Sequence, residues 1–245
     1  MTGGPKLYGE LASWFHLLTP PGEYEEEAGI YRRTIEEAAE GPVRTVLELG
    51  SGGGNNASHL KEHFEMTLTD LSEDMLDVSQ SLNPECEHVQ GDMRTLRLGR
   101  EFEVVFAHDA VDYLRTKEDL RACMETAWAH LRPGGVALFV PDYIKESFTP
   151  GADHGGTDEG DRGLRYLEWQ WDPDPGDTTY LVDFAYLLRE GSAVRAVHDR
   201  HECGLFGREE WLELLSEAGF RAEHRPTVLS DGAGNEMFVA VKQAD

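Results

Sequence analysis

The sequence is poor in basic residues and contains no long apolar run. Its 245 residues hold 22 Lys+Arg against 47 Asp+Glu, which gives a formal charge of −25 at pH 7. A protein that neutralises a phosphate backbone needs a basic face, so this charge argues against nucleic acid and against anionic membranes as partners. No apolar run approaches the roughly 18 residues that a membrane-spanning helix needs.

Cysteine is also scarce, since only Cys86, Cys123 and Cys203 are present, far apart in the chain. Their odd number and their spacing exclude a disulfide framework and a CxxC metal site, so we expect no bound metal. The first residues lack the basic segment and the apolar stretch of a secretory signal. These absences together predict a cytoplasmic protein with reduced thiols.

Short apolar runs alternate with helical segments through the first 142 residues. Such an alternation predicts βαβ units and a parallel sheet, and right-handed crossovers make a doubly wound sandwich the expected arrangement. The predicted strands cover residues 43–49, 64–69, 87–90, 102–107 and 136–140.

The pattern changes beyond this point. Residues 150–163 are rich in Gly, Asp and Glu and are predicted to form a mobile loop. Three extended stretches with period-two patterning follow, and we interpret them as an antiparallel β platform inserted into the α/β core. A helix over 209–218 and a strand over 236–241 then return the chain to the core. The extended stretches cover residues 164–171, 178–189 and 193–203.

Glycines and acidic residues follow the ends of three predicted strands. Gly50, Gly52 and Gly54 come directly after the first strand, where a dinucleotide GxGxxG motif would need a glycine in place of Asn55. A plain strand-to-helix turn would also explain these glycines. Asp70, however, ends the second strand, at the edge where open α/β sheets bind ligands and where an acid can accept both hydroxyls of a ribose. Gly91-Asp92-Met93 follows the third strand, where a carboxylate suits an adenine amino group.

Four motifs in this order, ELGSGGG, LTDLSEDML, QGDMRTL and LRPGG, resemble class I S-adenosylmethionine-dependent methyltransferases. The resemblance covers residues 7–142 and 209–241. It implies a Rossmann-like sheet of seven strands with the last strand antiparallel, and methyl transfer from S-adenosylmethionine to a nitrogen or oxygen of a small molecule. The chain is also similar to N,N-dimethyltransferases of nucleotide-linked amino sugars. It departs from them at Phe15-His16, where such enzymes often carry Tyr-Asp, and in lacking an evident Arg or Lys cluster for a diphosphate.

The resemblance also implies which residues bind the cofactor. Glu48, Gly50 and Gly52 would surround its methionine part, and Asp70 would hold the ribose. An N-terminal cap would supply one further contact. The implied cofactor-binding residues are Tyr24, Glu48, Gly50, Gly52, Asp70, Leu71, Met75, Asp92, Met93 and His108.

His108, just after the fourth strand, is the candidate catalytic residue, as a base or as a group that orients the acceptor. Asp109 or Asp112 would be its partner, and the alternative is that His108 only packs near the cofactor. The candidate acceptor-binding residues come from the inserted segment. For Trp169, packing in the core or at a dimer interface is the preferred explanation, and His154 has an equal explanation as a solvent-exposed loop residue. These candidates are Tyr143, His154, Trp169 and His201.

We therefore predict a single α/β chain in four parts, with a homodimer through the platform as a further expectation. The parts are an N-terminal helical cap (1–42), a cofactor-binding core (43–142), a lid with the β insertion (143–206) and a return to the core (207–245). Two other functions remain open from the sequence. One is a non-catalytic module that binds S-adenosylmethionine, and the other is a nicotinamide-dependent dehydrogenase, which Asn55 disfavours.

Overall fold

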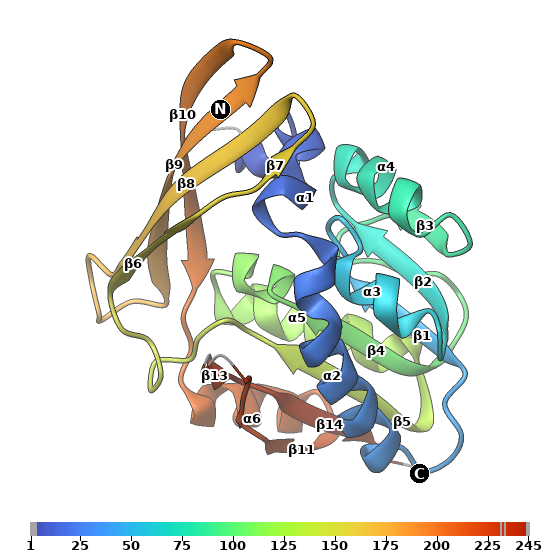
Figure 1. Ribbon diagram of the computed structural model, residues 1–245. Coiled ribbons are helices and arrows are strands. Elements are labelled where there is room, and N and C mark those ends of the chain that lie inside the picture. Colours follow the sequence, from blue (N-terminus) through green and yellow to red (C-terminus); the bar gives the residue numbers. More distant parts are fainter. Residues whose placement is uncertain (1–3, 231, 233, 244–245) are drawn as a thin grey trace.

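The computed structural model describes residues 4–230, 232 and 234–243. A seven-stranded sheet forms its core, in the order β11-β14-β5-β4-β1-β2-β3 (Figure 1). The strands are β1 (Thr45–Leu49), β2 (Glu65–Asp70), β3 (Glu87–Gln90), β4 (Phe102–His108), β5 (Leu131–Val140), β11 (Phe220–His224) and β14 (Phe238–Lys242).

The strand directions confirm the predicted fold class. β1 pairs in parallel with both β2 and β4, and β4 pairs in parallel with β5. β14 is antiparallel to β5, as expected for the last strand. The chain leaves β1 toward β2 on one side and later returns to β4 on the other, so the crevice beyond the carboxyl end of β1 is the switch point of the sheet. The sequence did not locate β11, which lies at one edge of the sheet.

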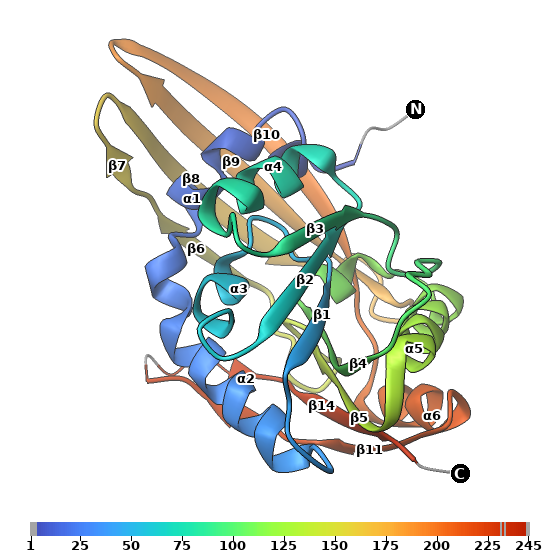
Figure 2. The same ribbon diagram turned by 90° about the vertical axis from the view of Figure 1, so that its right-hand side faces the viewer.

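Helices cover both faces of this sheet (Figure 2). Tyr31 and Ala57 pack with one set of buried strand residues, whereas Leu120 and Trp211 pack with the other. The hydroxyls of Ser72 and Thr116 cap two of the helices by accepting bonds from Met75 N and Asp119 N, respectively. The helices are α2 (Glu25–Ala38), α3 (Asn55–Leu60), α4 (Glu73–Leu82), α5 (Lys117–His130) and α6 (Arg208–Glu217).

The platform is a second, antiparallel sheet in the order β10-β9-β8-β6, with β7 paired to β8. Its strands are β6 (Gly151–Gly155), β7 (Asp158–Glu159), β8 (Arg162–Trp171), β9 (Thr179–Glu190) and β10 (Ala193–Gly204). The prediction of a mobile loop over residues 150–163 is wrong, because backbone pairing with β8 orders half of this segment as β6 and β7, and its last two residues belong to β8 itself.

The N-terminal segment lies between the core and the platform (Figure 1). It consists of short helices, and its Leu11, Trp14 and Leu17 pack on Leu164 and Tyr186 of the platform. The segment therefore joins the two sheets over the end of β1. Its elements are η1 (Lys6–Tyr8), η2 (Ala12–Trp14), α1 (Phe15–Leu18) and η3 (Pro21–Tyr24).

Two smaller elements complete the described chain. The 3-10 helix η4 (Ala110–Tyr113) follows β4, and a hairpin of β12 (Thr227–Val228) and β13 (Gly234–Asn235) precedes β14. Among the helices of the described residues, none is both long and apolar enough to cross a membrane.

Candidate functional site

The glycine turn after β1 can be formed only by residues without side chains. Gly50, Gly52 and Gly54 have φ angles of +72°, +53° and +77°. A Cβ at Gly50 would lie 2.3 Å from Ala110 Cβ and 2.8 Å from Met93 Cε. The backbone at Gly50 therefore approaches the loop after β4 closely and leaves its surface open to a ligand.

Asp70, at the end of β2, holds this turn in place. Its carboxylate accepts hydrogen bonds from Gly52 N at 2.9 Å and Ser72 N at 2.8 Å. Burial raises the pKa of Asp70, while these backbone donors act in the opposite direction. Each carboxylate oxygen keeps a further lone pair, so Asp70 is equipped to accept hydroxyl donors.

Glu48 is the least satisfied acidic group of the site. Its side chain is buried, and its Oε2 has no hydrogen-bond partner. Burial, and after it the charge of Asp70, raises the pKa of Glu48 to about 8. A buried carboxyl oxygen without a donor is costly, so a ligand with a cationic N–H group fits this position.

The residues predicted around adenine differ in their exposure. Leu71, Asp92 and Met93 line the cavity beyond β1. Met75 is fully buried beneath the turn, with its Cε 3.8 Å from the Cβ position of Gly52, and does not line the cavity. The structure therefore gives no support to the expected direct contact of Met75 with adenine. The carboxylate of Asp92 is bound by Arg94, which also lines the cavity.

His108 and Asp109 lie at the end of β4. His108 Nε2 is 3.1 Å from Asp109 Oδ1, and its Nδ1 is 3.3 Å from Asn56 Nδ2. Since both ring nitrogens have partners, the structure favours an orienting role for His108 over that of a free base. Asp109 is the one non-glycine residue among those described with a positive φ, at 47°. Backbone strain of this kind concentrates at functional sites.

A cluster of carboxylates lies beside Asp109, and we call Asp109, Asp112, Asp142 and Glu168 the carboxylate cluster. Asp142 N donates to Asp112 Oδ2 at 2.9 Å, which ties the end of β5 to η4. Burial, followed by the charge of Asp142, raises the pKa of Asp109 and of Asp112 well above their usual range. Burial also raises the pKa of Glu168 to about 7, with further contributions from Asp142 and Asp153. The cluster is therefore a site where a bound cation would be strongly favoured.

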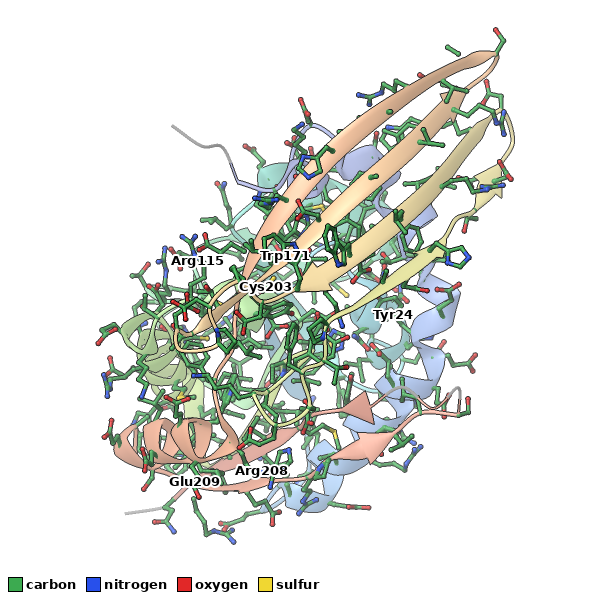
Figure 3. The ribbon with its side chains drawn as sticks, turned by 90° about the vertical axis from the view of Figure 1, so that its left-hand side faces the viewer. Tyr24, Arg115, Trp171, Cys203, Arg208 and Glu209 are labelled. Carbon is green, nitrogen blue, oxygen red and sulfur yellow. The ribbon has the colours of Figure 1, made fainter. Side chains whose placement is uncertain are left out.

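One cavity of about 1050 Å³ contains all these groups except the buried Met75. This is at the upper end of ordinary ligand pockets, so it has room for a cofactor and an acceptor together. Tyr24 enters from the N-terminal segment and Cys203 from the platform, as Figure 3 shows. A neighbouring cavity of about 520 Å³ shares Asp142, Glu168, Tyr180 and Val182 with it.

The four predicted acceptor residues divide between the two faces of the platform. His201 lines the large cavity, and Tyr143 lines the neighbouring one. His154 and Trp169 line neither, because they occupy alternate strand positions that point to the outer face, where the Trp169 side chain is 56% exposed. The structure therefore gives no support to the expected roles of His154 and Trp169 in acceptor binding.

Several cavity residues were not assigned from the sequence. Asp142 follows the end of β5, so the rule that located Asp70 and Asp92 would have found it. Glu168 would have followed from strand alternation, whereas nothing local marks Tyr113. In the part of the chain that the structure describes, no group of three or more His, Cys, Asp or Glu residues is arranged to hold a metal ion.

Comparisons with known proteins agree with this geometry. Residues 46–135 match a family described as "Methyltransferase domain". A dTDP-3-amino-3,4,6-trideoxy-alpha-D-glucopyranose N,N-dimethyltransferase of Streptomyces venezuelae is 31% identical over 222 residues, which cover 89% of this chain and 90% of that protein. A dTDP-3-amino-3,6-dideoxy-alpha-D-glucopyranose N,N-dimethyltransferase of Streptomyces fradiae is 28% identical, with coverages of 92% and 90%.

Solved structures give the same result. DesVI of Streptomyces venezuelae superposes with a TM-score of 0.82 at 26% identity, covering 97% of this chain and 98% of that chain. The sugar N-methyltransferase KedS8 from Streptoalloteichus has a TM-score of 0.80 at 25% identity, with coverages of 90% and 88%. CalS10, an amino pentose methyltransferase of Micromonospora echinaspora solved with S-adenosylmethionine bound, has a TM-score of 0.75 at 25% identity, with coverages of 90% and 92%.

Proposed function

The chain belongs to the S-adenosylmethionine-dependent methyltransferases, and we propose that its acceptor is an amino nitrogen of a small molecule. The observation that carries this proposal is the carboxylate cluster. An amine enters as a cation, which Asp109, Asp112, Asp142 and Glu168 would attract. A phenol or a carboxylate acceptor would bring neutral or negative charge to the same place, where it gains nothing from these acids.

We assign the cofactor to the half of the cavity beyond β1. Glu48 would accept the ammonium group of its methionine part, with Gly50 and Gly52 offering backbone at close range. Asp70 would accept the ribose hydroxyls. The adenine would lie against Leu71 and Met93, and Asp92, Tyr24 and His108 would complete the surroundings.

The bound cofactor supplies a methyl group on a positively charged sulfur, which a nitrogen lone pair can displace. The chain's own residues align the acceptor and exclude water, and alignment of this kind supplies up to about 7–11 kcal/mol in well-oriented systems. His108 would hold Asp109 through its Nε2, so that the carboxylate faces the acceptor. Its other nitrogen is fixed by Asn56.

We further propose a nucleotide-linked amino sugar as the acceptor, since three of the relatives are N,N-dimethyltransferases of dTDP-amino sugars. Lys6 and Arg115 line the cavity and are the candidates for the diphosphate. Arg115 pairs with Glu202, but both side chains are about half exposed. An exposed ion pair contributes about 0–1 kcal/mol, so a diphosphate could displace Glu202 at little cost.

Cofactor consumption across matched amines, phenols and carboxylates, with mass detection of the added CH₂, tests the proposed acceptor. We expect turnover with amines, and turnover confined to the other classes would contradict the proposal. Comparing dTDP-3-amino-3,4,6-trideoxy-α-D-glucopyranose with the same amino sugar lacking the nucleotide tests the scaffold. Arg115→Ala should raise KM for the nucleotide form alone, and equal KM values for both forms would exclude a diphosphate site.

The remaining expectations concern the whole chain. We propose that the protein works in the cytoplasm and divides into the four parts given above, with the platform choosing the acceptor. We also propose that the outer face of the platform pairs two copies of the chain. Exposed Leu167, Trp169, Leu187 and Val194 support this pairing.

A further inference from the structure

A chain of four hydrogen-bonded side chains runs along one wall of the cavity, from the platform to the N-terminal segment. Asp199 Oδ2 lies 3.2 Å from His201 Nε2, and His201 Nδ1 lies 2.7 Å from the Tyr113 hydroxyl. The Tyr113 hydroxyl in turn lies 2.8 Å from that of Tyr8. Tyr8, Tyr113 and His201 line the cavity, whereas Asp199 is buried behind them.

Asp199 fixes the direction of this chain. Its carboxylate also accepts hydrogen bonds from Lys6 N at 3.0 Å and Leu7 N at 2.9 Å. Burial acts to raise the pKa of Asp199, but the bonds from His201 and from these backbone groups outweigh it and lower the pKa. Asp199 is therefore charged and accepts a hydrogen bond from His201 Nε2–H, which keeps the proton of the ring on Nε2.

The remaining bonds follow from that proton. With Nε2 protonated, Nδ1 of a neutral imidazole is an acceptor, so Tyr113 donates to it. Tyr113 then accepts from Tyr8, whose oxygen keeps its lone pairs for a donor in the cavity. Burial is the main cause that raises the pKa of both phenols, so each keeps its proton and can only pass one on.

Tyr8 also lies near the carboxylate cluster. The negative charges of Asp109 and Asp142 contribute to the raised pKa of Tyr8, which places both acids within electrostatic reach of its hydroxyl. Tyr8, Asp109 and Asp142 also line the same cavity, so an ammonium held by these acids could present an N–H bond to Tyr8. It must lose that proton before its nitrogen can attack.

We propose that the chain Tyr8–Tyr113–His201–Asp199 takes this proton from the acceptor. The proposal rests on the proposed amine acceptor. Tyr8 is the catalytic residue, and Tyr113, His201 and Asp199 are positioning residues that act through it. The N–H bond of the ammonium breaks and its electron pair stays on nitrogen as the lone pair. The proton moves to Tyr8 while Tyr8 passes its own to Tyr113, and Tyr113 passes its own to His201 Nδ1. Both tyrosines end neutral, and the imidazolium faces the Asp199 carboxylate.

Several titratable groups surround His201. Tyr8 from η1, Tyr113 from η4, and Asp199 and Cys203 from β10 are the titratable groups that face it. The neighbouring strand β9 contributes Phe184 and Val182, which do not titrate, and Tyr186, whose pKa is raised by burial and then by the charge of Asp199. Among these groups, only the Nδ1 atom of His201 is a free acceptor at the end of the chain of hydrogen bonds, so it is the place where the proton would come to rest.

Three variants interrupt the proton path while leaving the cavity shape nearly intact: Tyr8→Phe, Tyr113→Phe and His201→Asn. The asparagine amide oxygen can still accept from Tyr113 but cannot take a proton. His198→Asn is the matched control, because His198 lies on the outer face of the same strand beside Asp183. The acceptor probe is dTDP-3-amino-3,4,6-trideoxy-α-D-glucopyranose.

At neutral pH we expect each of the three variants to lower kcat by about 10²-fold with little change in KM, as is usual for loss of a general base. The deficit should shrink as the pH approaches the pKa of the acceptor's own ammonium, while His198→Asn keeps the parent profile. A loss of kcat that is constant over pH would mean that these residues have only a structural role. Unchanged kcat in the three variants would mean that the carboxylate cluster, and not Tyr8, removes the proton of the acceptor. Either result overturns the proposal.

A second measurement separates this proposal from the proposed function. With S-adenosylhomocysteine bound and no acceptor present, ¹⁵N NMR of the histidine rings should show His201 as the Nε2–H tautomer, and Asp199→Asn should disturb it. An Nδ1–H tautomer would overturn the proton path whatever the acceptor is. Absence of amine methylation by the parent protein would contradict the proposed function, and with it the proton-carrying role.

Discussion

The two halves of the cavity are built from acids that are held in different ways. On the proposed cofactor side, Asp70 is fixed by backbone N–H groups of the turns beside it. Glu48 is the penultimate residue of β1. On the acceptor side, Asp109, Asp112 and Asp142 are held against one another and face Glu168 of the platform.

This difference indicates a division of work between the halves. Backbone donors lower the cost of a charged Asp70 and keep it ready for a ligand that is the same in every turnover. Clustered carboxylates raise each other's pKa and gain most when a cation arrives, so they select the acceptor by charge. Substitutions in one half should therefore leave the other half's ligand largely unaffected.

The largest effect is expected at the glycine turn. Gly50→Ala should destabilise the protein by about 3 kcal/mol or more, because the left-handed backbone cost of about 1–2 kcal/mol adds to a collision with Ala110. Gly99→Ala is the control, since Gly99 has a similar φ of +70° but no atom within 4 Å of its Cβ position. Urea unfolding of both variants measures the difference, and equal losses would show that the close approach at Gly50 costs nothing.

Asp70→Ala should weaken cofactor binding by about 100-fold, since it removes the ribose acceptor and leaves the donors of Gly52 and Ser72 without their partner. Calorimetric titration with S-adenosylhomocysteine provides the measurement, with the exposed Asp77→Ala as its control. Undiminished affinity in Asp70→Ala would remove Asp70 from the cofactor site.

Asp142→Asn should sharpen the comparison from the acceptor side. We expect kcat/KM for the amine to fall by about 30-fold, because one of the negative charges that attract its ammonium is removed, while the cofactor Kd stays within about twofold. Asp161→Asn, an exposed change at the far end of the platform, should alter neither value. A parallel loss of cofactor affinity in Asp142→Asn would break the division between the halves.

Glu48 predicts a pH dependence. In the free protein it keeps its proton up to about pH 8, whereas in the unfolded chain it releases the proton near its ordinary pKa. Between these values the folded state binds more protons, so stability should fall as pH rises. A cationic ligand favours the charged form, so affinity for S-adenosylhomocysteine should rise several-fold as the pH increases toward about 8. Glu48→Gln should flatten both curves, and a parent affinity independent of pH would contradict the assignment.

The smallest kinetic effect is expected on the outer face of the platform. Trp169→Ser should leave cofactor affinity and kcat within about twofold, because this side chain points away from both cavities. If two copies pair through this face, the variant should elute as a smaller species than the parent in size-exclusion chromatography. If the parent protein and the Trp169→Ser variant both elute as monomers, the pairing is refuted.

The sequence predicted the cofactor half far better than the acceptor half, and the reason is physical. The glycine turn and Asp70 depend on a few consecutive residues, so their pattern survives in the sequence. Tyr113 and Glu168 reach the cavity only after two sheets have packed together, and no local pattern records that packing. The sequence predicted a loop over residues 150–163, so it did not reveal that β6 pairs with β8. This pairing turns His154 toward the outer face of the platform.

Two broader alternatives are also decided. The matches to methyltransferases over about nine-tenths of the chain set aside a nicotinamide-dependent dehydrogenase and a module without catalysis. The acidic excess of the sequence acquires a partial explanation as well, because eight of its acids line the cavity: Glu10, Glu48, Asp70, Asp92, Asp109, Asp112, Asp142 and Glu168.

The most direct measurement is competition between an amine and its hydroxyl twin, which is the same compound with a hydroxyl group in place of the amino group. S-adenosylmethionine is supplied in excess. The parent protein and Asp142→Asn would each receive equal amounts of the two compounds, and mass spectrometry would identify which gains CH₂. We expect the parent to methylate the amine alone, and Asp142→Asn to lose most of that turnover while its cofactor affinity is retained. Methylation of the hydroxyl twin by the parent, or a preference that Asp142→Asn leaves unchanged, would contradict selection of the acceptor by the carboxylate cluster.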